Sequence, residues 1–143
     1  MENPATTARL KIARQKPERI LIIQTAFLGD VILVEPLIAQ TKERFPDARI
    51  DVIVIPAAGN LLETHPAIDG LIRYDKRNRE RGLVGFFRLV GRLKKKRYHL
   101  ALVPHRSLSS AALAWLAKIP LRIGFDKSAG RFLFHHCVQY RQA

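Results

Sequence analysis

Short apolar runs alternate with longer segments of helical spacing along this chain. Residues 20–24 (Ile-Leu-Ile-Ile-Gln) form the clearest run. It is short, uninterrupted and rich in β-branched residues, which is typical of a strand buried on both faces of a parallel sheet. Similar runs predict further strands at 50–55, 71–74, 99–103, 121–124 and, within a broader segment, 132–140.

The segments between the runs predict four helices, at 31–45, 57–64, 83–93 and 108–118. Pro36 is expected in the first turns of its helix, where a missing N–H costs least. Trp115 stands among small and apolar residues and is expected to pack in the core or at an interface. The third helix has its basic residues largely off an apolar stripe, which consists of Leu83, Phe86, Phe87, Val90 and Leu93.

Strands that alternate with helices indicate βαβ units and right-handed crossovers. The expected fold class is therefore α/β, with a doubly wound and mainly parallel sheet. Residues 1–18 lack periodicity and are expected to form a flexible basic arm, while 19–143 form the domain. Ligands of such sheets bind at the carboxyl ends of the strands, a rule that selects the loops 25–30, 104–107 and 125–131.

The first of these loops brings Gly29 and Asp30 to the start of a helix. Glycine lets a ligand approach the backbone closely, and the amides of a helix N-terminus favour anions. Asp30 either caps that helix or acts as a general base that takes a proton from a sugar hydroxyl. The loop contains neither G-x-G-x-x-G nor G-K-[ST], so it is neither a dinucleotide fingerprint nor a Walker loop.

Cations and hydroxyl groups characterise the other two loops. Arg106 can grip a phosphate or carboxylate at two points. His105 either hydrogen-bonds a ligand hydroxyl or is a structural histidine, and Ser107 is expected to cap the helix that follows. Residues 124–131 contain two glycines, two cations and a serine, which predicts either an anion-binding nest or an ordinary surface turn.

The charge of the chain favours anionic partners. Its 143 residues include 25 Lys and Arg against 12 Asp and Glu, a formal charge of +13. A basic band at 76–97, opposed only by Glu80, either attracts nucleic acid, acidic lipid or phosphorylated sugar, or is a solvated helix face. Nucleic acid is the least favoured of these partners, because Phe86 and Phe87 belong to the apolar stripe and leave no aromatic residues for base stacking.

No metal site is expected. His135 and His136 are neighbours in a strand-like segment and point to opposite faces, and Cys137 is the single cysteine. The lone cysteine also favours a cytoplasmic chain. Two further observations agree with that location: residues 1–19 have no secretory signal, and no apolar run reaches about 18 residues.

Residues 20–31 (Ile-Leu-Ile-Ile-Gln-Thr-Ala-Phe-Leu-Gly-Asp-Val) resemble the opening strand and Gly-Asp turn of the ADP-heptose:lipopolysaccharide heptosyltransferases, in glycosyltransferase family 9. Residues 37–51 are similar to the helix and second strand that follow there, and 105–107 and 122–131 are similar to later segments. The resemblance covers about residues 20–140. Glu35 departs from the small or apolar residue expected before the proline.

The resemblance implies the Rossmann-like N-terminal domain of a GT-B glycosyltransferase, on the acceptor side of the cleft. It implies inverting transfer of heptose from ADP-heptose to the lipopolysaccharide core, with no metal or cofactor and with Asp30 as the catalytic base. Contacts with the acceptor or with a phosphate are implied for Thr25, Gly29, His105, Arg106 and Arg131.

The partners implied by this resemblance are the lipopolysaccharide core acceptor and the nucleotide-sugar. Because the acceptor is anchored in a membrane, the basic face at 88–97 is expected to make peripheral contact with anionic lipid on the cytoplasmic face of the inner membrane. The C-terminal donor domain is expected to be absent, so the chain alone is expected to transfer no sugar. The alternative to an enzyme is a non-catalytic module that binds anionic glycolipid or nucleic acid.

Overall fold

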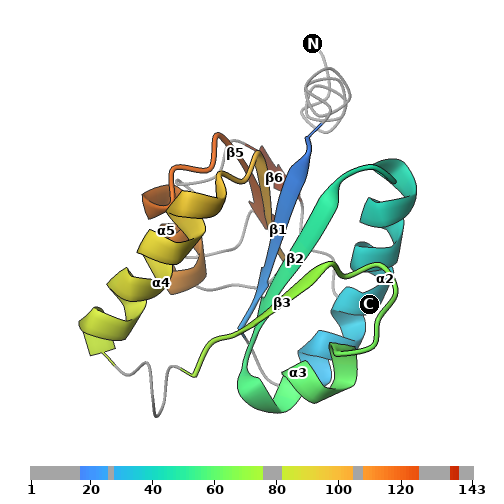
Figure 1. The fold of residues 1–143 in the computed structure, drawn as a ribbon, viewed down its shortest axis with the longest axis horizontal. Helices are drawn as coiled ribbons and strands as arrows, with labels where there is room; N and C mark the ends of the chain where they lie inside the picture. Colours follow the sequence, from blue (N-terminus) through green and yellow to red (C-terminus); the bar gives the residue numbers. More distant parts are fainter. Residues whose placement is uncertain (1–16, 26–27, 76–81, 105–107, 126–135, 139–143) are drawn as a thin grey trace.

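The computed structural model describes residues 17–25, 28–75, 82–104, 108–125 and 136–138 (Figure 1). Its strands are β1 (Arg19–Gln24), β2 (Arg49–Val54), β3 (Gly70–Arg73), β4 (Leu100–Val103), β5 (Leu121–Phe125) and β6 (His136–Val138). Its helices are α2 (Leu28–Arg44), α3 (Pro56–Leu62), α4 (Gly82–Lys96) and α5 (Leu108–Leu116). Of the predicted arm at 1–18, only Pro17 and Glu18 fall within the described residues, and the arm stays a prediction.

The six strands form one sheet in the order β3-β2-β1-β4-β5-β6, and all neighbouring strands in it are parallel. The chain first builds outward from β1 to β3 and then returns to the other side of β1 to build β4 to β6. This order confirms the predicted doubly wound α/β fold. The direction of building reverses between β1 and β4, which is the topological switch point where sheets of this kind bind their ligands.

Two helical layers cover the sheet, with α2 and α3 on one face and α4 and α5 on the other (Figure 1). Along β1, Ile20 and Ile22 belong to the core under α2 and α3, whereas Leu21 and Ile23 belong to the core under α4 and α5. All four side chains are fully buried. Successive strand side chains point to opposite faces, so a strand covered on both faces needs an unbroken apolar run.

Helix α2 begins earlier than the apolar spacing predicts. It starts at Leu28, so Gly29 and Asp30 lie inside its first turn rather than in a preceding loop, and Asp30 is not at the capping position before the helix. The prediction that Pro36 lies in the first turns is therefore wrong, because Pro36 is in the interior of a 17-residue helix. There it cannot donate a hydrogen bond to the carbonyl of Ile32.

Helix α4 buries a different line of residues from the predicted stripe. The buried residues of the helix are Gly85, Leu89, Val90 and Leu93. Phe86 packs partly against this core, but Leu83 and Phe87 are exposed. Trp115, on α5, is also exposed, so it does not pack in the core, and the expected alternative of an interface stays a prediction. Helical spacing identifies which side chains share a face, but the neighbouring elements decide how wide a strip of that face is covered.

A buried carboxylate ties the last turn of α4 to the sheet. Asp51, on β2, is 1% exposed, and the Tyr98 hydroxyl donates a hydrogen bond to its Oδ2 at 2.5 Å. Arg49 Nε lies 3.1 Å from Asp51 Oδ1, and Lys96 Nζ lies 3.7 Å from Oδ2. Arg19 Nη1 in turn donates to the Lys96 carbonyl at 2.7 Å. Two cations and a hydroxyl thus satisfy a charge that would otherwise be costly to bury.

This arrangement perturbs Tyr98 and restricts Gly70. Burial, followed by the hydrogen bond and charge of Asp51, raises the pKa of Tyr98 far above its ordinary value. A Cβ atom added at Gly70, on the neighbouring strand β3, would lie 2.4 Å from Asp51 Oδ1 and 3.0 Å from Arg49 Nη2. Glycine at this strand position therefore leaves the room that the buried ion pair occupies.

We expect Gly70→Ala to lower the free energy of unfolding by about 1–3 kcal/mol, because the new methyl group must displace the buried carboxylate. Gly91→Ala is the matched control. A Cβ atom at Gly91, in the middle of α4, meets nothing within 4 Å, so this change should stabilise the helix by about 0.5–1 kcal/mol. Urea unfolding of both variants checks the pair, and equal effects of the two alanines would contradict this account.

Tyr98 also predicts a dependence of stability on alkaline pH. Its pKa is raised in the folded state, so above about pH 10 the unfolded chain loses the phenolic proton while the folded chain keeps it. The free energy of unfolding should therefore fall with rising pH by up to about 1.4 kcal/mol per pH unit from this group. Tyr98→Phe should remove that contribution to the slope, measured by urea unfolding between pH 9 and pH 11. Parallel pH profiles would refute the assignment.

Candidate functional site

The switch point lies at the carboxyl ends of β1 and β4. From β1 the chain continues into α2, on one face of the sheet, and from β4 it continues into α5, on the other face (Figure 1). The two departing segments are joined by a buried hydrogen bond, because Thr25 Oγ1 lies 3.1 Å from Ser110 Oγ. This contact holds the start of the β1–α2 connection against the first turn of α5.

Buried polar side chains gather at this rim. Among the described residues, those that are buried and polar or charged are Gln24, Thr25, Thr41, Asp51 and Ser110. Three of them, Gln24, Thr25 and Ser110, stand next to the switch point. Polar groups are buried at a cost unless they are hydrogen-bonded, and all three have partners. The described part of the rim is therefore polar and hydrogen-bonded.

The first turn of α2 is one described part of this rim, and its backbone favours an anion. Gly29 and Asp30 both have helical backbone there. The first amides of a helix have no acceptor within the helix and carry its positive end, so this turn favours a negatively charged group. The side chain of Asp30 lies outside the part of the chain that the structure describes, and its role as a base stays a prediction.

Of the other predicted site residues, some fall within the described part of the chain and some do not. Thr25 is described, and it is buried and hydrogen-bonded to Ser110. His105 and Arg106 fall between β4 and α5, and Arg131 falls between β5 and β6, all outside the described residues. The chain order assigns all of them to segments that begin at the carboxyl ends of β4 and β5. Their contacts stay predictions.

Sequence reasoning missed Ser110. The residue lies in a segment of small residues, Leu-Ser-Ser-Ala-Ala-Leu, in which either serine could have been a solvent-exposed helix residue. A polar side chain within an apolar helix that follows a strand at the switch point is the signal that could have identified it. No group of three or more metal-ligating side chains occurs in the part of the chain that the structure describes.

Comparison with known proteins assigns the chain to a family. Residues 86–143 match glycosyltransferase family 9 (heptosyltransferase). Lipopolysaccharide heptosyltransferase 3 of Escherichia coli is 33% identical over 112 residues, which are 77% of this chain and 31% of that protein. Lipooligosaccharide heptosyltransferase 2 of Haemophilus ducreyi is 30% identical over 116 residues, which are 75% of this chain and 30% of that protein.

The chain belongs to glycosyltransferase family 9.

Solved structures agree with this family 9 assignment. The glycosyl transferase family 9 structure from Veillonella parvula superposes with a TM-score of 0.79 at 23% identity, over 87% of this chain and 36% of that one. E. coli ADP-heptose lps heptosyltransferase II superposes with a TM-score of 0.70 at 28% identity, over 85% of this chain and 35% of that one. The predicted GT-B-type α/β fold is therefore confirmed for this family 9 chain.

The family 9 chain spans about a third of the length of the relatives and solved structures that it matches. Among its described residues, none of the helices is both long enough and apolar enough to cross a membrane.

The Thr25–Ser110 contact generates a prediction about the rim of this family 9 domain. Thr25→Val and Ser110→Ala should each destabilise the fold, and in a double-mutant cycle they should couple by about 0.5–1.5 kcal/mol, because either change removes the same hydrogen bond. Thr41→Val is the control, since Thr41 Oγ1 donates to the Leu37 carbonyl within α2. Its effect should add to that of Ser110→Ala, as urea unfolding can measure. Additive effects of Thr25→Val and Ser110→Ala would refute the coupling.

Proposed function

We propose that this chain is the acceptor-side part of a family 9 glycosyltransferase that transfers heptose from ADP-heptose to the core of lipopolysaccharide. The observation that carries the proposal is the position of Gly29 and Asp30, in the first turn of a helix that leaves the switch point of the sheet. The names of the relatives, heptosyltransferases of lipopolysaccharide and lipooligosaccharide, support the choice of sugar and acceptor.

In the proposed reaction, Asp30 is the general base. It takes the proton of an acceptor hydroxyl as that oxygen forms a bond to the anomeric carbon of heptose. The bond between the anomeric carbon and the diphosphate breaks on the opposite side, and ADP leaves with the electron pair. Attack from the side opposite to the leaving group inverts the configuration at the anomeric carbon. The proton thus ends on Asp30, the electron pair on ADP and the heptose on the acceptor oxygen.

The other residues of the rim have supporting parts in this proposal. Gly29 gives the acceptor access to the backbone amides of the first turn. His105, Arg106 and Arg131 bind the acidic groups of the acceptor or a phosphate of the donor. Thr25 is buried and bonded to Ser110, so we assign it a positioning part, in which it holds the entry into α2.

The charge of the chain fits such an acceptor. A formal charge of +13 on 143 residues favours a ligand that carries acidic sugars and phosphates, and attraction of this kind raises the rate of encounter. The nucleotide-sugar is then proposed to be held mainly by the part of the relatives that this chain does not match. We therefore expect the 143-residue chain alone to show no turnover of ADP-heptose.

A non-catalytic module that binds anionic glycolipid is the second candidate function. It is favoured by the same excess of cations, and it needs no base at position 30. The two functions differ in what the carboxylate does. An enzyme depends on Asp30 for turnover, whereas a binding module tolerates its replacement by the amide.

The test is a chimera in which this chain replaces the matching part of E. coli lipopolysaccharide heptosyltransferase 3. Asp30→Asn should lower turnover by about 10²–10⁴-fold, because the amide cannot accept the hydroxyl proton, while the affinity for the acceptor stays nearly unchanged. Asp47→Asn is the matched control, since Asp47 is exposed in the turn that follows α2 and its replacement makes the same change of charge.

The assay measures the ADP that is released when heptose is transferred to core oligosaccharide. Calorimetry measures the affinity for the acceptor. Full turnover in Asp30→Asn would refute the role of the base. Acceptor binding by the chain, together with an inactive chimera in both its unsubstituted and Asp30→Asn forms, would favour the binding module.

A further inference from the structure

Most of the large apolar side chains that are exposed lie on the face of the sheet covered by α4 and α5. Among the described residues, the large apolar side chains that are exposed are Leu61, Leu83, Val84, Phe87 and Trp115. Leu83 and Val84, in the first turn of α4, are 74% and 72% exposed, and Phe87, one turn on, is 55% exposed. Trp115 is on α5, which contacts α4 on the same face of the sheet. Only Leu61 belongs to the opposite face, on α3.

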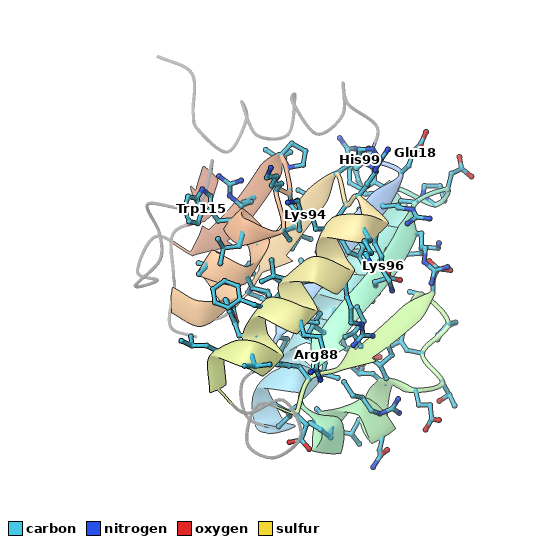
Figure 2. The ribbon with its side chains drawn as sticks, turned by 60° about the vertical axis from the view of Figure 1, so that its left-hand side comes forward. Glu18, Arg88, Lys94, Lys96, His99 and Trp115 are labelled. Carbon is cyan, nitrogen blue, oxygen red and sulfur yellow. The ribbon has the colours of Figure 1, made fainter. Side chains whose placement is uncertain are left out.

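The same outer surface is cationic. Helix α4 contains no Asp or Glu, and its basic residues are Arg88, Arg92, Lys94, Lys95 and Lys96. Lys96 is engaged with Asp51, whereas the other four point to solvent. Figure 2 shows Arg88, Lys94 and Lys96 along α4, with Trp115 on the neighbouring helix. The surface therefore combines bulky apolar side chains with several positive charges and no negative one on α4.

The order of the residues along the helix separates the two kinds of side chain. A helix turns about 100° per residue, so Leu83, Phe87 and Lys94 lie in one outward row. By the same rule, Val84, Arg88 and Lys95 lie in the adjacent row. Both rows are apolar where α4 begins and cationic where it ends.

Helix α4 cannot rotate about its axis to bury these two rows. Leu89 and Leu93 are almost fully buried on the inner side of the helix, and the ion pair of Lys96 with Asp51 holds its last turn. That last turn lies at the amino ends of the strands, because Arg19, the first residue of β1, donates a hydrogen bond to the Lys96 carbonyl. The first, apolar turn of α4 is therefore nearer to the carboxyl ends of the strands, where the proposed site lies.

We infer that the outer surface of α4 and α5 docks on a membrane that carries anionic phospholipid. Leu83, Val84 and Phe87 enter the boundary between headgroups and acyl chains. The cations Arg88, Arg92, Lys94 and Lys95 bind the lipid phosphates. Trp115 lies at the level of the headgroups, where an indole ring is favoured.

The mixture of side chains selects lipid over other anionic partners. Nucleic acids are bound by cations together with aromatic rings that stack on bases, and the aliphatic Leu83 and Val84 cannot stack. An amphipathic helix with Lys and Arg on one side and Leu and Phe on the other is the kind that lies in a lipid interface. The docked orientation brings the carboxyl ends of the strands toward the membrane. This inference rests on the proposed function, because a lipopolysaccharide acceptor is carried by membrane lipid.

The test is co-sedimentation of the 143-residue chain with vesicles of phosphatidylcholine, with and without about 30% phosphatidylglycerol. The chain should bind the anionic vesicles at least about tenfold more tightly. Trp115 is the single tryptophan, so its fluorescence should shift to shorter wavelength on binding and be quenched by brominated lipid. Equal binding to both kinds of vesicle, or fluorescence unchanged on binding, would overturn the inference.

Matched variants separate the apolar part from the charged part. Leu83→Ser with Val84→Ser, and Lys94→Glu with Lys95→Glu, should each weaken binding by about tenfold or more. Leu61→Ser and Arg44→Glu are exposed controls on the opposite face and should have little effect. Phe87 is not substituted in these variants, because its ring packs edge-to-face on that of Phe86, with ring centroids 5.5 Å apart. Binding that only the glutamates weaken would overturn insertion, and equal losses in the controls would overturn the assigned face.

The two assays test membrane docking and sugar transfer separately. The vesicle assay contains no sugar donor or acceptor, whereas the Asp30→Asn assay uses a water-soluble core oligosaccharide. Loss of the vesicle effect with turnover intact overturns only the docking face. Preference of the chain for a short RNA or an acidic peptide over the anionic vesicles, measured by competition, would also overturn it.

Discussion

Strand β1 has a hydrogen-bonded partner on each edge and a helical layer on each face, and the rest of the structure depends on that position. Because β2 and β4 pair with its two edges, the chain must leave the sheet in opposite directions around it. Two connections then depart from neighbouring carboxyl ends and leave a rim between them. The rim holds Thr25 and Ser110 in contact and sets the first turn of α2 beside it.

The amino and the carboxyl ends of the strands have different kinds of polar interaction. At the amino ends, Asp51 is enclosed by a tyrosine and two cations, an arrangement that fixes the end of α4. Next to the carboxyl ends of β1 and β4, the hydroxyls of Thr25 and Ser110 are in contact, and both groups are neutral. Removing a partner from a buried carboxylate is costly, so Asp51 suits an anchor. At the opposite rim, the contact between Thr25 and Ser110 joins two neutral hydroxyls, so this contact adds no charge beside the proposed ligand site.

The sheet could be predicted from the sequence because a strand covered on both faces must be apolar at every position, as 20–24 is. The start of α2 could not, since Leu28, Gly29 and Asp30 have a composition equally suited to a turn. The exposure of Phe87 and Trp115 depends on how far α5 covers α4, which no local pattern records. Asp51 looks like any polar residue in a strand, and the contacts from Tyr98, Arg49 and Lys96 explain its burial. Within the candidate site, spacing placed Gly29 and Asp30 directly after the first strand but did not indicate Ser110, the buried partner of Thr25.

The register of β1 has a consequence for how the protein is made. Ile20 pairs with Ile50 on one edge and with Leu100 on the other, so one edge can close early in translation and the other only late. Until β4 has left the ribosome, the nascent chain has an apolar strand with an open edge, the kind that associates with other chains. The rim between β1 and β4 does not exist in that shorter chain. The rim where we propose that ligands bind is therefore completed only after β4 and α5 have been synthesised, although its first residues are among the earliest in the chain.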